Sequence, residues 1–246
     1  MPLEAAAADA MVARAKAAQP TWAARPLAER IALVKAGVAR LTAMKETVAE
    51  ELARQMGRPI RFGQGEMGGV NARTDYMSEI AAETLAPHMI EDSDKFRRYL
   101  ARAPLGVVFI IAPWNYPYLT TINTLAPALI AGNTVVLKHA SQTLLVGERL
   151  AQAFHEAGVP ADVFQNVVLD HATTEALIAA RAFGFVNFTG SVGGGQAIER
   201  AAAGTFTPLG LELGGKDPGY VRADANLDAA VDNRAHNIGV TVSGVA

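Results

Sequence analysis

The sequence predicts an α/β protein built on a doubly wound, Rossmann-like parallel sheet, and three observations support this. Four short apolar segments of strand length alternate with longer, alanine-rich segments that favour helix. The strand segments are almost continuously apolar, which is typical of strands covered on both faces. Gly, Pro or Asn bounds each of them. Because strands that alternate with helices imply right-handed crossovers, we expect helices on both faces of one parallel sheet.

The residues before this alternation predict helices. The first stretch of the chain favours a helix, which we expect to break at Pro20-Thr21-Trp22. Apolar residues then recur at three- to four-residue steps across residues 27–52, which is a helical spacing. Met56-Gly57-Arg58-Pro59 supplies the expected end of that helix. A second helix is expected over residues 71–85, before Pro87.

The expected strands and helices of the α/β part follow one another along the chain. The strands are expected at 106–112, 134–138, 163–169 and 183–188, and the helices at 119–131, 143–157, 173–181 and 196–203. Further on, residues 219–221 predict another short strand, and residues 224–231 predict a turn that leads into a helix. The residues after Asn233 show neither a helical period nor a clear strand alternation.

Composition limits the class of protein. With 50% hydrophobic and 19% charged residues, the chain has enough apolar residues for a substantial core. Lys and Arg total 22 against 24 Asp and Glu, so the charge gives no argument for a nucleic-acid partner. We expect a cytoplasmic protein with no membrane contact, because the apolar runs are too short to cross a bilayer and the N-terminus lacks a signal-peptide pattern. The absence of cysteine excludes disulfides and thiolate chemistry within these residues.

Polar residues follow two of the predicted strands at their carboxyl ends, where doubly wound sheets bind ligands. Pro113-Trp114-Asn115 follows the strand at 106–112, and the neutral amide of Asn115 suits an oxyanion that develops in a transition state. Lys138 ends the next strand, where its ammonium group can bind ribose hydroxyls or a phosphate. The simpler alternatives are a turn-forming asparagine and a solvated lysine.

A glycine-rich turn and an acidic residue follow further along the chain. Phe188-Thr189-Gly190-Ser191 ends the fourth strand and leads through Gly193-Gly194-Gly195 into a helix. This arrangement puts backbone N–H groups and a helix N-terminus near a pyrophosphate, although it departs from the G-x-G-x-x-G pattern. Glu212 lies between Leu211 and Leu213. We expect partial burial to raise its pKa toward that of a useful general base.

Taken together, four motifs resemble the aldehyde dehydrogenase superfamily in their order and spacing. The motifs are Pro113–Asn115, Lys138-His139-Ala140-Ser141, Phe188–Ser191 and Leu211-Glu212-Leu213-Gly214-Gly215-Lys216. The resemblance runs from about Trp22 to Asn233 and implies NAD(P)-dependent oxidation of an aldehyde to a carboxylic acid. It further implies a cofactor-binding domain over residues 1–213, an oligomerisation hairpin near 92–103, and the start of a catalytic domain over 214–246.

The resemblance also implies roles for individual residues. Asn115 would donate to the oxyanion, and Glu212 would be the general base that activates water for thioester breakdown. The residues expected to contact the cofactor are Trp114, Asn115, Lys138, His139, Ala140, Ser141, Gly190, Ser191 and Leu213. No metal is expected, because the five histidines show no metal-ligand spacing. The expected partners are a small-molecule aldehyde and, as in the family, further copies of the chain.

Two segments indicate a narrower resemblance. The family often carries K-P-S-E where this chain has Lys138–Ser141, so Ser141 stands in place of a glutamate that disfavours a 2′-phosphate. We therefore hypothesise that the protein tolerates or prefers NADP, with NAD as the alternative. The K-H-A-S form and residues 156–168 resemble the succinate-semialdehyde dehydrogenase branch, which makes succinate semialdehyde the first candidate for the aldehyde.

The family's nucleophile is a cysteine that follows the glutamate in the sequence, and this chain contains no cysteine. Because the first chemical step needs a thiolate, we expect this chain alone to have impaired or no dehydrogenase activity. A frameshift with early termination, a gene fragment and a degenerate pseudogene product would each explain the difference. The alternative function is a non-catalytic dinucleotide-binding or subunit-interaction module.

Overall fold

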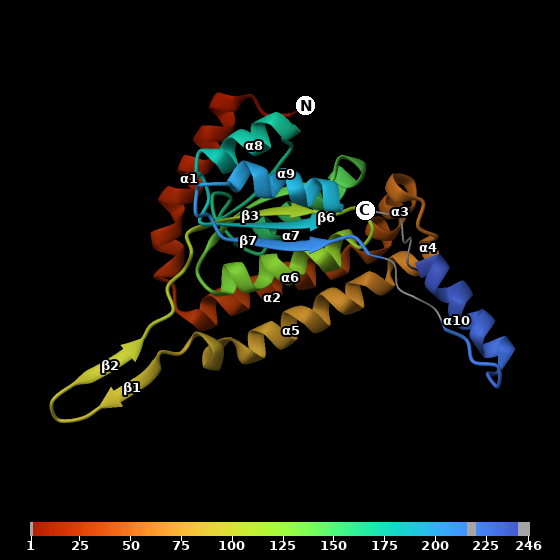
Figure 1. Ribbon diagram of the computed structural model, residues 1–246, viewed down its shortest axis with the longest axis horizontal. Helices are drawn as coiled ribbons and strands as arrows, with labels where there is room; N and C mark the ends of the chain where they lie inside the picture. The colour runs from red at the N-terminus through yellow and green to blue at the C-terminus, as the bar shows by residue number, and fades with distance from the viewer. Residues whose placement is uncertain (1, 216–219, 241–246) are drawn as a thin grey trace.

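A computed structural model describes residues 2–215 and 220–240 of the chain, with side chains up to Asn233. It confirms the predicted fold class, because a parallel five-stranded sheet lies between two layers of helices (Figure 1). The strands are β3 (Val107–Ala112), β4 (Thr134–His139), β5 (Phe164–Val167), β6 (Phe185–Gly190) and β7 (Leu209–Leu213). Their order in the sheet is β5-β4-β3-β6-β7, so all five carboxyl ends lie along one edge.

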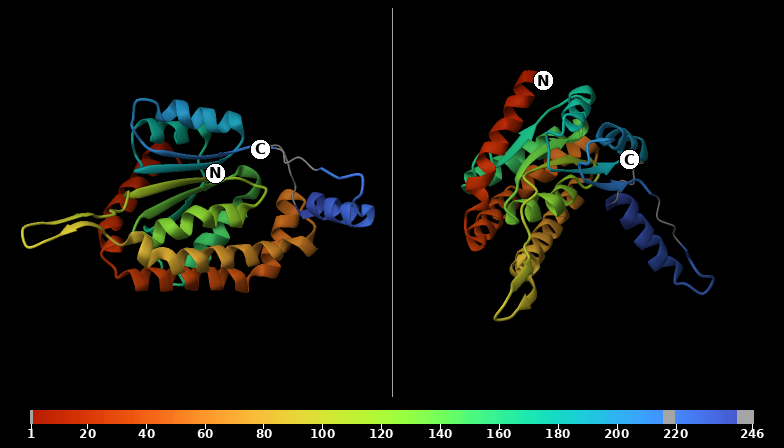
Figure 2. Two further views of the ribbon diagram at one scale, coloured as in Figure 1. Left: turned by 60° about the horizontal axis from the view of Figure 1, so that its bottom comes forward. Right: turned by 60° about the vertical axis from the view of Figure 1, so that its left-hand side comes forward.

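The helices divide between the two faces of the sheet, as Figures 1 and 2 show. The α9 layer consists of α1 (Ala5–Ala23), α8 (His171–Ala179) and α9 (Val192–Ala202). The α6 layer consists of α2 (Leu27–Ala43), α3 (Lys45–Met56), α5 (Gly65–Leu85), α6 (Pro117–Ile130) and α7 (Leu144–Glu156), with the short α4 (Ile60–Gly63) and η1 (Ser141–Thr143) in its connections. None of the described helices is long and apolar enough to cross a membrane.

The alternation of side chains along the strands produces two separate cores. In β3, Val107, Phe109 and Ile111 belong to the core of the α9 layer, whereas Val108 and Ile110 belong to the core of the α6 layer. Every residue of this strand is buried. Successive side chains of a strand point to opposite faces, so a strand covered on both sides must be apolar throughout.

The order of the strands reverses between β3 and β6. From β3 the sheet continues through β4 to β5 on one side, and through β6 to β7 on the other. The chain after β3 enters α6 on one face, and the chain after β6 enters α9 on the opposite face. In doubly wound sheets the ligand binds in the crevice that forms at such a switch point. The fold therefore places a candidate site between the ends of β3 and β6.

The expected helix break at Pro20-Thr21-Trp22 is wrong, because α1 continues through Pro20 to Ala23. Trp22 is buried, and its Nε1–H donates to the backbone carbonyl of Leu129 at 2.9 Å. This anchor fixes the last turn of α1 against the end of α6. The tertiary contact therefore outweighs the cost of a proline within the last turn of a helix.

Most of the other predicted boundaries are confirmed with small shifts of their ends. The pattern over residues 27–52 forms two helices, α2 and α3, which are divided at Met44. Gly57 ends α3 with a left-handed φ of 78°. The strand β7 was not expected.

The structure also corrects the expectations for the last part of the chain. Tyr220 and Val221 do not form the expected strand, and Gly219 lies outside the described residues. The turn into a helix expected over residues 224–231 is present, and its helix is α10 (Leu227–Val240), which continues where the sequence shows no helical period.

An antiparallel hairpin formed by β1 (His88–Asp92) and β2 (Arg97–Leu100) projects from the molecule at the end opposite α10 (Figures 1 and 2). It overlaps the hairpin segment expected near residues 92–103. Several of its apolar side chains are exposed, including those of Ile90 and Leu100. The hairpin therefore presents apolar surface that the described part of the chain does not cover.

Candidate functional site

The predicted site residues lie along the carboxyl edge of the sheet. Pro113-Trp114-Asn115 follows β3, and Lys138 and His139 end β4. Gly190 and Leu213, which end β6 and β7, are paired with each other in the register of these strands. Because β4, β3, β6 and β7 are consecutive neighbours in the sheet, the fold brings all four predicted motifs to one edge.

The alternation along β7 sends Leu213 and Glu212 to opposite faces of the sheet. Leu211 packs against the core of the α9 layer, so Leu213, two residues later, points to the same side. Leu213 lies close to Gly195 of α9, where an added Cβ would come within 2.4 Å of Leu213 Cδ2. Glu212 points to the other face, on the side of the α6 layer.

Glu212 is exposed, which contradicts the expected partial burial. Since β7 is an edge strand of the described sheet, it has a neighbouring strand on one side alone. On the face to which Glu212 points, α6 packs against β3 and β4 rather than β7. The two flanking leucines point to the opposite face and do not shelter the carboxylate. The expected burial of Glu212 is therefore not provided by the described residues.

Asn115 is half-buried in the loop that follows β3. Its Oδ1 accepts the backbone N–H of Tyr116 at 3.1 Å, and its backbone carbonyl accepts a hydrogen bond from Arg58. Among the described residues, none accepts a hydrogen bond from its Nδ2. The amide N–H₂ group is thus available to a ligand, and a neutral donor of this kind suits a developing oxyanion.

A buried ion pair, whose residues belong to none of the four sequence motifs, supports this loop. Arg58 donates from Nη1 to Glu66 Oε2 and from Nη2 to the backbone carbonyl of Asn115. Glu66 Oε1 accepts the backbone N–H groups of Tyr118 and Leu119 at 2.8 and 2.9 Å. Both charged side chains are only 1% exposed. The carboxylate therefore caps the first turn of α6, which is the electrostatically favourable end of a helix for an anion.

Lys138 is half-buried at the end of β4. Burial holds the pKa of Lys138 below its ordinary value, and the nearby Asp170 opposes this effect. Within the described residues, its Nζ has no hydrogen-bond acceptor or ion-pair partner. Ala140 and Ser141, which follow β4, are half-buried and exposed respectively. The ammonium group of Lys138 is therefore free to bind an oxygen-rich ligand.

The side chain of His139 is buried and turned toward the α6 layer. Its Nδ1 accepts the backbone N–H of Ala140 and lies 3.0 Å from the hydroxyl oxygen of Thr143. Its Nε2 lies 3.5 Å from the carbonyl oxygen of Pro117. Burial lowers the pKa of His139 to about 4, an effect that Pro117 opposes and Lys138 reinforces. The neutral imidazole thus joins β4 to the start of α6.

The turn after β6 leads directly into α9. Ser191 caps this helix, because its Oγ accepts the N–H of Gly194 at 3.1 Å. The N–H groups of Val192 and Gly193 have no acceptor in the described part of the chain. An added Cβ at Gly193 would meet open space. A helix N-terminus with free N–H groups and room for a close approach fits a phosphate group.

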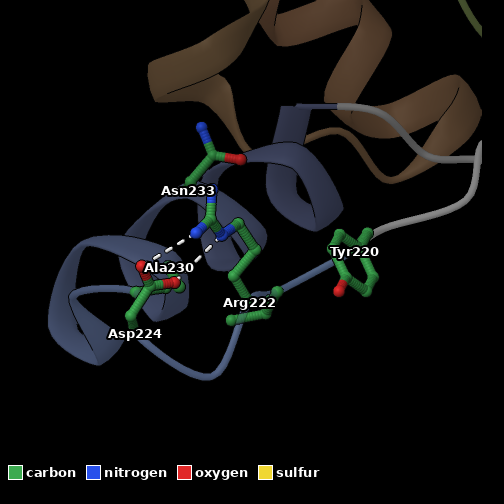
Figure 3. A pocket seen from close by; sticks show the side chains of 7 residues that line it. Tyr220, Arg222, Asp224, Ala230 and Asn233 are labelled. Carbon is green, nitrogen blue, oxygen red and sulfur yellow. Dashed lines mark hydrogen bonds and ion pairs between the residues drawn. The ribbon is translucent and has the colours of Figure 1, made fainter.

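A separate hollow lies beside α10 (Figure 3). Its lining consists of Tyr220, Val221, Arg222, Asp224, Ala225, Ala230 and Asn233. The charges of Arg222 and Asp224 are paired with each other through two hydrogen bonds of 3.0 Å. None of the predicted site residues lines this hollow. Across the described residues, no group of three or more His, Asp or Glu side chains is arranged to hold a metal ion.

Comparison with known sequences identifies relatives of this chain. The family described as "Aldehyde dehydrogenase family" matches residues 2–244. The succinate-semialdehyde dehydrogenase (NADP⁺) of Deinococcus radiodurans is 34% identical over 241 residues, which cover 96% of this chain and 50% of that protein. The match is wider than the range from Trp22 to Asn233 that the motifs indicated. It includes residues 234–244, so the family match continues past Asn233, where the resemblance of the motifs ends.

Solved structures show the same fold. The structure of PnpE in complex with nicotinamide adenine dinucleotide has a TM-score of 0.89 at 35% identity, covering 97% of this chain and 49% of that one. The NADP-dependent glyceraldehyde-3-phosphate dehydrogenase from Bacillus halodurans, complexed with NADP, has a TM-score of 0.84 at 31% identity, covering 94% and 49%. This chain thus spans about half the length of the relatives it matches. From the family match and the shared fold, the chain belongs to the aldehyde dehydrogenase family of oxidoreductases.

Proposed function

We propose that this chain forms the NAD(P)-binding part of an aldehyde-oxidising enzyme, and that the dinucleotide binds across the carboxyl edge of the sheet. The observation that carries this proposal is a set of hydrogen-bond donors without acceptors among the described residues. They are Asn115 Nδ2, Lys138 Nζ and the first N–H groups of α9, and they lie at the ends of β3, β4 and β6. A dinucleotide presents hydroxyl, phosphate and carboxamide oxygens, which such donors recognise.

Each part of the cofactor has a matching group in this proposal. Lys138, together with the loop of His139, Ala140 and Ser141, would hold the adenosine ribose. Gly190 and Ser191 would place the pyrophosphate at the start of α9. Trp114, Asn115 and Leu213 would line the nicotinamide, which accepts a hydride when the cofactor is bound.

The proposal also assigns the catalytic roles. The amide of Asn115 would donate to the oxyanion formed from the aldehyde, and Glu212 would activate the water that hydrolyses the thioester. The 246 residues contain no cysteine, so the thiolate of the first step is not among them. We therefore propose that residues 1–213 are the cofactor-binding domain, that 214–246 begin the catalytic domain, and that this chain alone binds the cofactor without turnover.

We further propose NADP as the preferred cofactor and succinate semialdehyde as the aldehyde of the whole enzyme. Ser141 is exposed in the segment that follows β4, where it would add no negative charge near a 2′-phosphate. The relative from Deinococcus radiodurans is named as an NADP⁺-dependent succinate-semialdehyde dehydrogenase. The names of two further relatives specify N-succinylglutamate 5-semialdehyde, which is also a semialdehyde.

Titration of the purified chain with NADP and with NAD tests the cofactor proposal. We expect both to bind, NADP at least as tightly as NAD, and we expect Ser141→Glu to weaken NADP alone through charge repulsion. Tighter binding of NAD by the wild type would reject the NADP preference. Failure to bind either dinucleotide would reject the cofactor site itself.

Turnover is tested by mixing the chain with NADP and succinate semialdehyde and following reduction of the nicotinamide. We expect binding without reduction, which is also the behaviour of a non-catalytic dinucleotide-binding module. Reduction by this chain would show that a residue other than cysteine supplies the nucleophile.

The hairpin of β1 and β2 is the part of the chain that we propose for self-association. Ile90, Phe96 and Leu100 are 60%, 56% and 61% exposed, so the hairpin carries apolar side chains in contact with water. Sedimentation of the wild type against the variant Ile90→Lys/Leu100→Lys tests this role. A wild type that stays monomeric at high concentration would reject it.

A cytoplasmic location stays a prediction.

A further inference from the structure

We propose that the buried Arg58–Glu66 pair is the positioning element for Asn115, and that it directs the Asn115 amide into the crevice. This inference rests on the proposed function of Asn115. Neither charged side chain reaches the crevice, because both are almost fully buried. Arg58 and Glu66 are therefore positioning residues rather than catalytic ones.

The pair holds the loop on both sides of Pro117, the first residue of α6. On one side, Arg58 donates to the carbonyl of Asn115, and its guanidinium lies over the ring of Tyr116 at 4.7 Å. On the other side, Glu66 accepts the N–H groups of Tyr118 and Leu119. Because Arg58 also binds Glu66, the two ends of this short segment are joined through one ion pair.

The local sequence does not fix this loop by itself. Tyr116, at the N-cap of α6, has φ −127° and ψ 65° and makes no side-chain cap hydrogen bond. The cap comes from Glu66 in α5 instead. With its carbonyl held by Arg58 and its Oδ1 held by Tyr116 N–H, Asn115 has Nδ2 left for a ligand. The ion pair thus holds the backbone of Asn115, and the N–H of the adjacent Tyr116 holds its rotamer.

The attraction between the two buried charges is by itself weak evidence for a role in stability. Replacing a buried ion pair with apolar side chains of similar volume is often neutral or stabilising. Moreover, Arg58 Nε is buried and has no hydrogen-bond partner among the residues that the structure describes, so they do not use the full bonding capacity of arginine. An apolar pair could not bind the carbonyl of Asn115. The forked guanidinium of Arg58 binds this carbonyl and Glu66 at the same time.

The test replaces the pair with apolar residues and observes the loop directly. The chain has two tryptophans, Trp22 and Trp114, so incorporation of fluorotryptophan gives two signals in a fluorine NMR spectrum. The variant Arg58→Met/Glu66→Leu should have a lower thermal midpoint, because the Asn115 carbonyl and the N–H groups of Tyr118 and Leu119 lose their partners, and its spectrum is recorded below that midpoint. We expect its Trp114 signal to shift or broaden, its Trp22 signal to stay in place, and its affinity for NADP to fall. A role in stability alone would leave the Trp114 signal unchanged in a folded variant.

A matched control comes from the other end of α6. Arg30 is also buried and donates to the carbonyl of Ile130, the last residue of that helix. Arg30→Lys should leave the Trp114 signal unchanged, whereas Arg58→Lys should move it, because a lysine cannot bind Glu66 and the Asn115 carbonyl as a fork. This pair of single variants decides the question even if the double variant does not fold.

The outcome that overturns the proposal is an unchanged Trp114 signal in the folded double variant or in Arg58→Lys. The fluorine spectrum needs no ligand, so it separates this inference from the proposed function. If the wild type binds neither dinucleotide, the cofactor assignment fails, and the Trp114 signal still shows whether the ion pair sets the loop.

Discussion

The two ends of α6 are each held by a buried arginine, but the two arginines bind different kinds of partner. At the amino edge of the sheet, Arg30 donates to three backbone carbonyls, those of Ile130, Ala23 and Arg25. At the carboxyl edge, Arg58 binds the carboxylate of Glu66 and one carbonyl, that of Asn115. Arg30 therefore joins backbone segments of the fold, whereas Arg58 binds the loop that carries the candidate site residue Asn115.

The polar residues around the two arginines show the same difference. At the amino edge, Asn133 donates to Ala128 O and accepts from Gly106 N–H, both at 3.1 Å, so its amide is used by the fold. At the carboxyl edge, the amide nitrogen of Asn115 and the ammonium of Lys138 have no acceptor among the described residues. Polar groups that the fold leaves unused mark the edge where a ligand can bind. The comparison therefore separates residues for stability from residues for binding, and variants can test each side of it.

The largest effect on stability is expected at the amino edge. Arg30→Ala leaves three carbonyls without their donor, so the free energy of unfolding should fall by about 3 kcal/mol. Urea denaturation measures this loss. Arg14→Ala is the control, because its pair with Asp162 is exposed and should contribute less than about 1 kcal/mol. Equal losses of unfolding free energy in the two variants would contradict a special role of Arg30 in stabilising the fold.

The next largest effect is a dependence of the free energy of unfolding on pH, through His139 at the carboxyl edge. Burial lowers the pKa of His139 from 6.5 to about 4 in the folded chain. As the pH falls below the ordinary pKa of 6.5, His139 therefore binds a proton in the unfolded chain but stays neutral in the folded chain. The free energy of unfolding should fall by about 2 kcal/mol between about pH 7 and pH 5.

The variant His139→Asn should remove this part of the pH dependence in denaturation measured across that range. His171→Asn changes an exposed histidine and should leave the pH dependence as it is in the wild type. If the two variants behave alike, the buried imidazole is not the group responsible.

A binding effect with little effect on stability is expected for Lys138. Lys138→Met removes the ammonium that we assign to the adenosine ribose, so the dissociation constant for NADP should rise about ten-fold. The free energy of unfolding should change little, because burial already disfavours the charged form of this lysine. Lys16→Met removes the same charge from the exposed side of α1 and should leave NADP binding unaltered. A loss of stability without a loss of affinity for NADP would mean that Lys138 stabilises the fold and does not bind the cofactor.

The sequence predicted the parts of this picture that depend on local pattern. The strands β3, β4, β5 and β6 are short apolar runs, and their spacing is enough to place Asn115, Lys138 and Ser191 at the carboxyl edge. The missed strand, β7, has leucines at 209, 211 and 213 that alternate with Gly210 and Glu212. That period-two pattern is typical of a half-buried strand and could have revealed it.

The ion pair and the exposure of Glu212 could not be predicted in this way. Arg58 follows the end of one helix and Glu66 lies in the first turn of another, and their burial depends on how α5 packs against α6. The exposure of Glu212 depends on which helix lies under the edge strand. Neither property is carried by the residues that neighbour these positions in the sequence.

The smallest effect is expected for Glu212, which tests the correction to its predicted burial. Because the carboxylate is exposed on an edge strand, Glu212→Gln should change the free energy of unfolding by less than about 0.5 kcal/mol. Glu199→Gln, at an exposed position of α9, is the matched control and should behave alike. Urea denaturation of both variants makes the measurement. A clear loss for Glu212→Gln alone would contradict the exposure of this carboxylate.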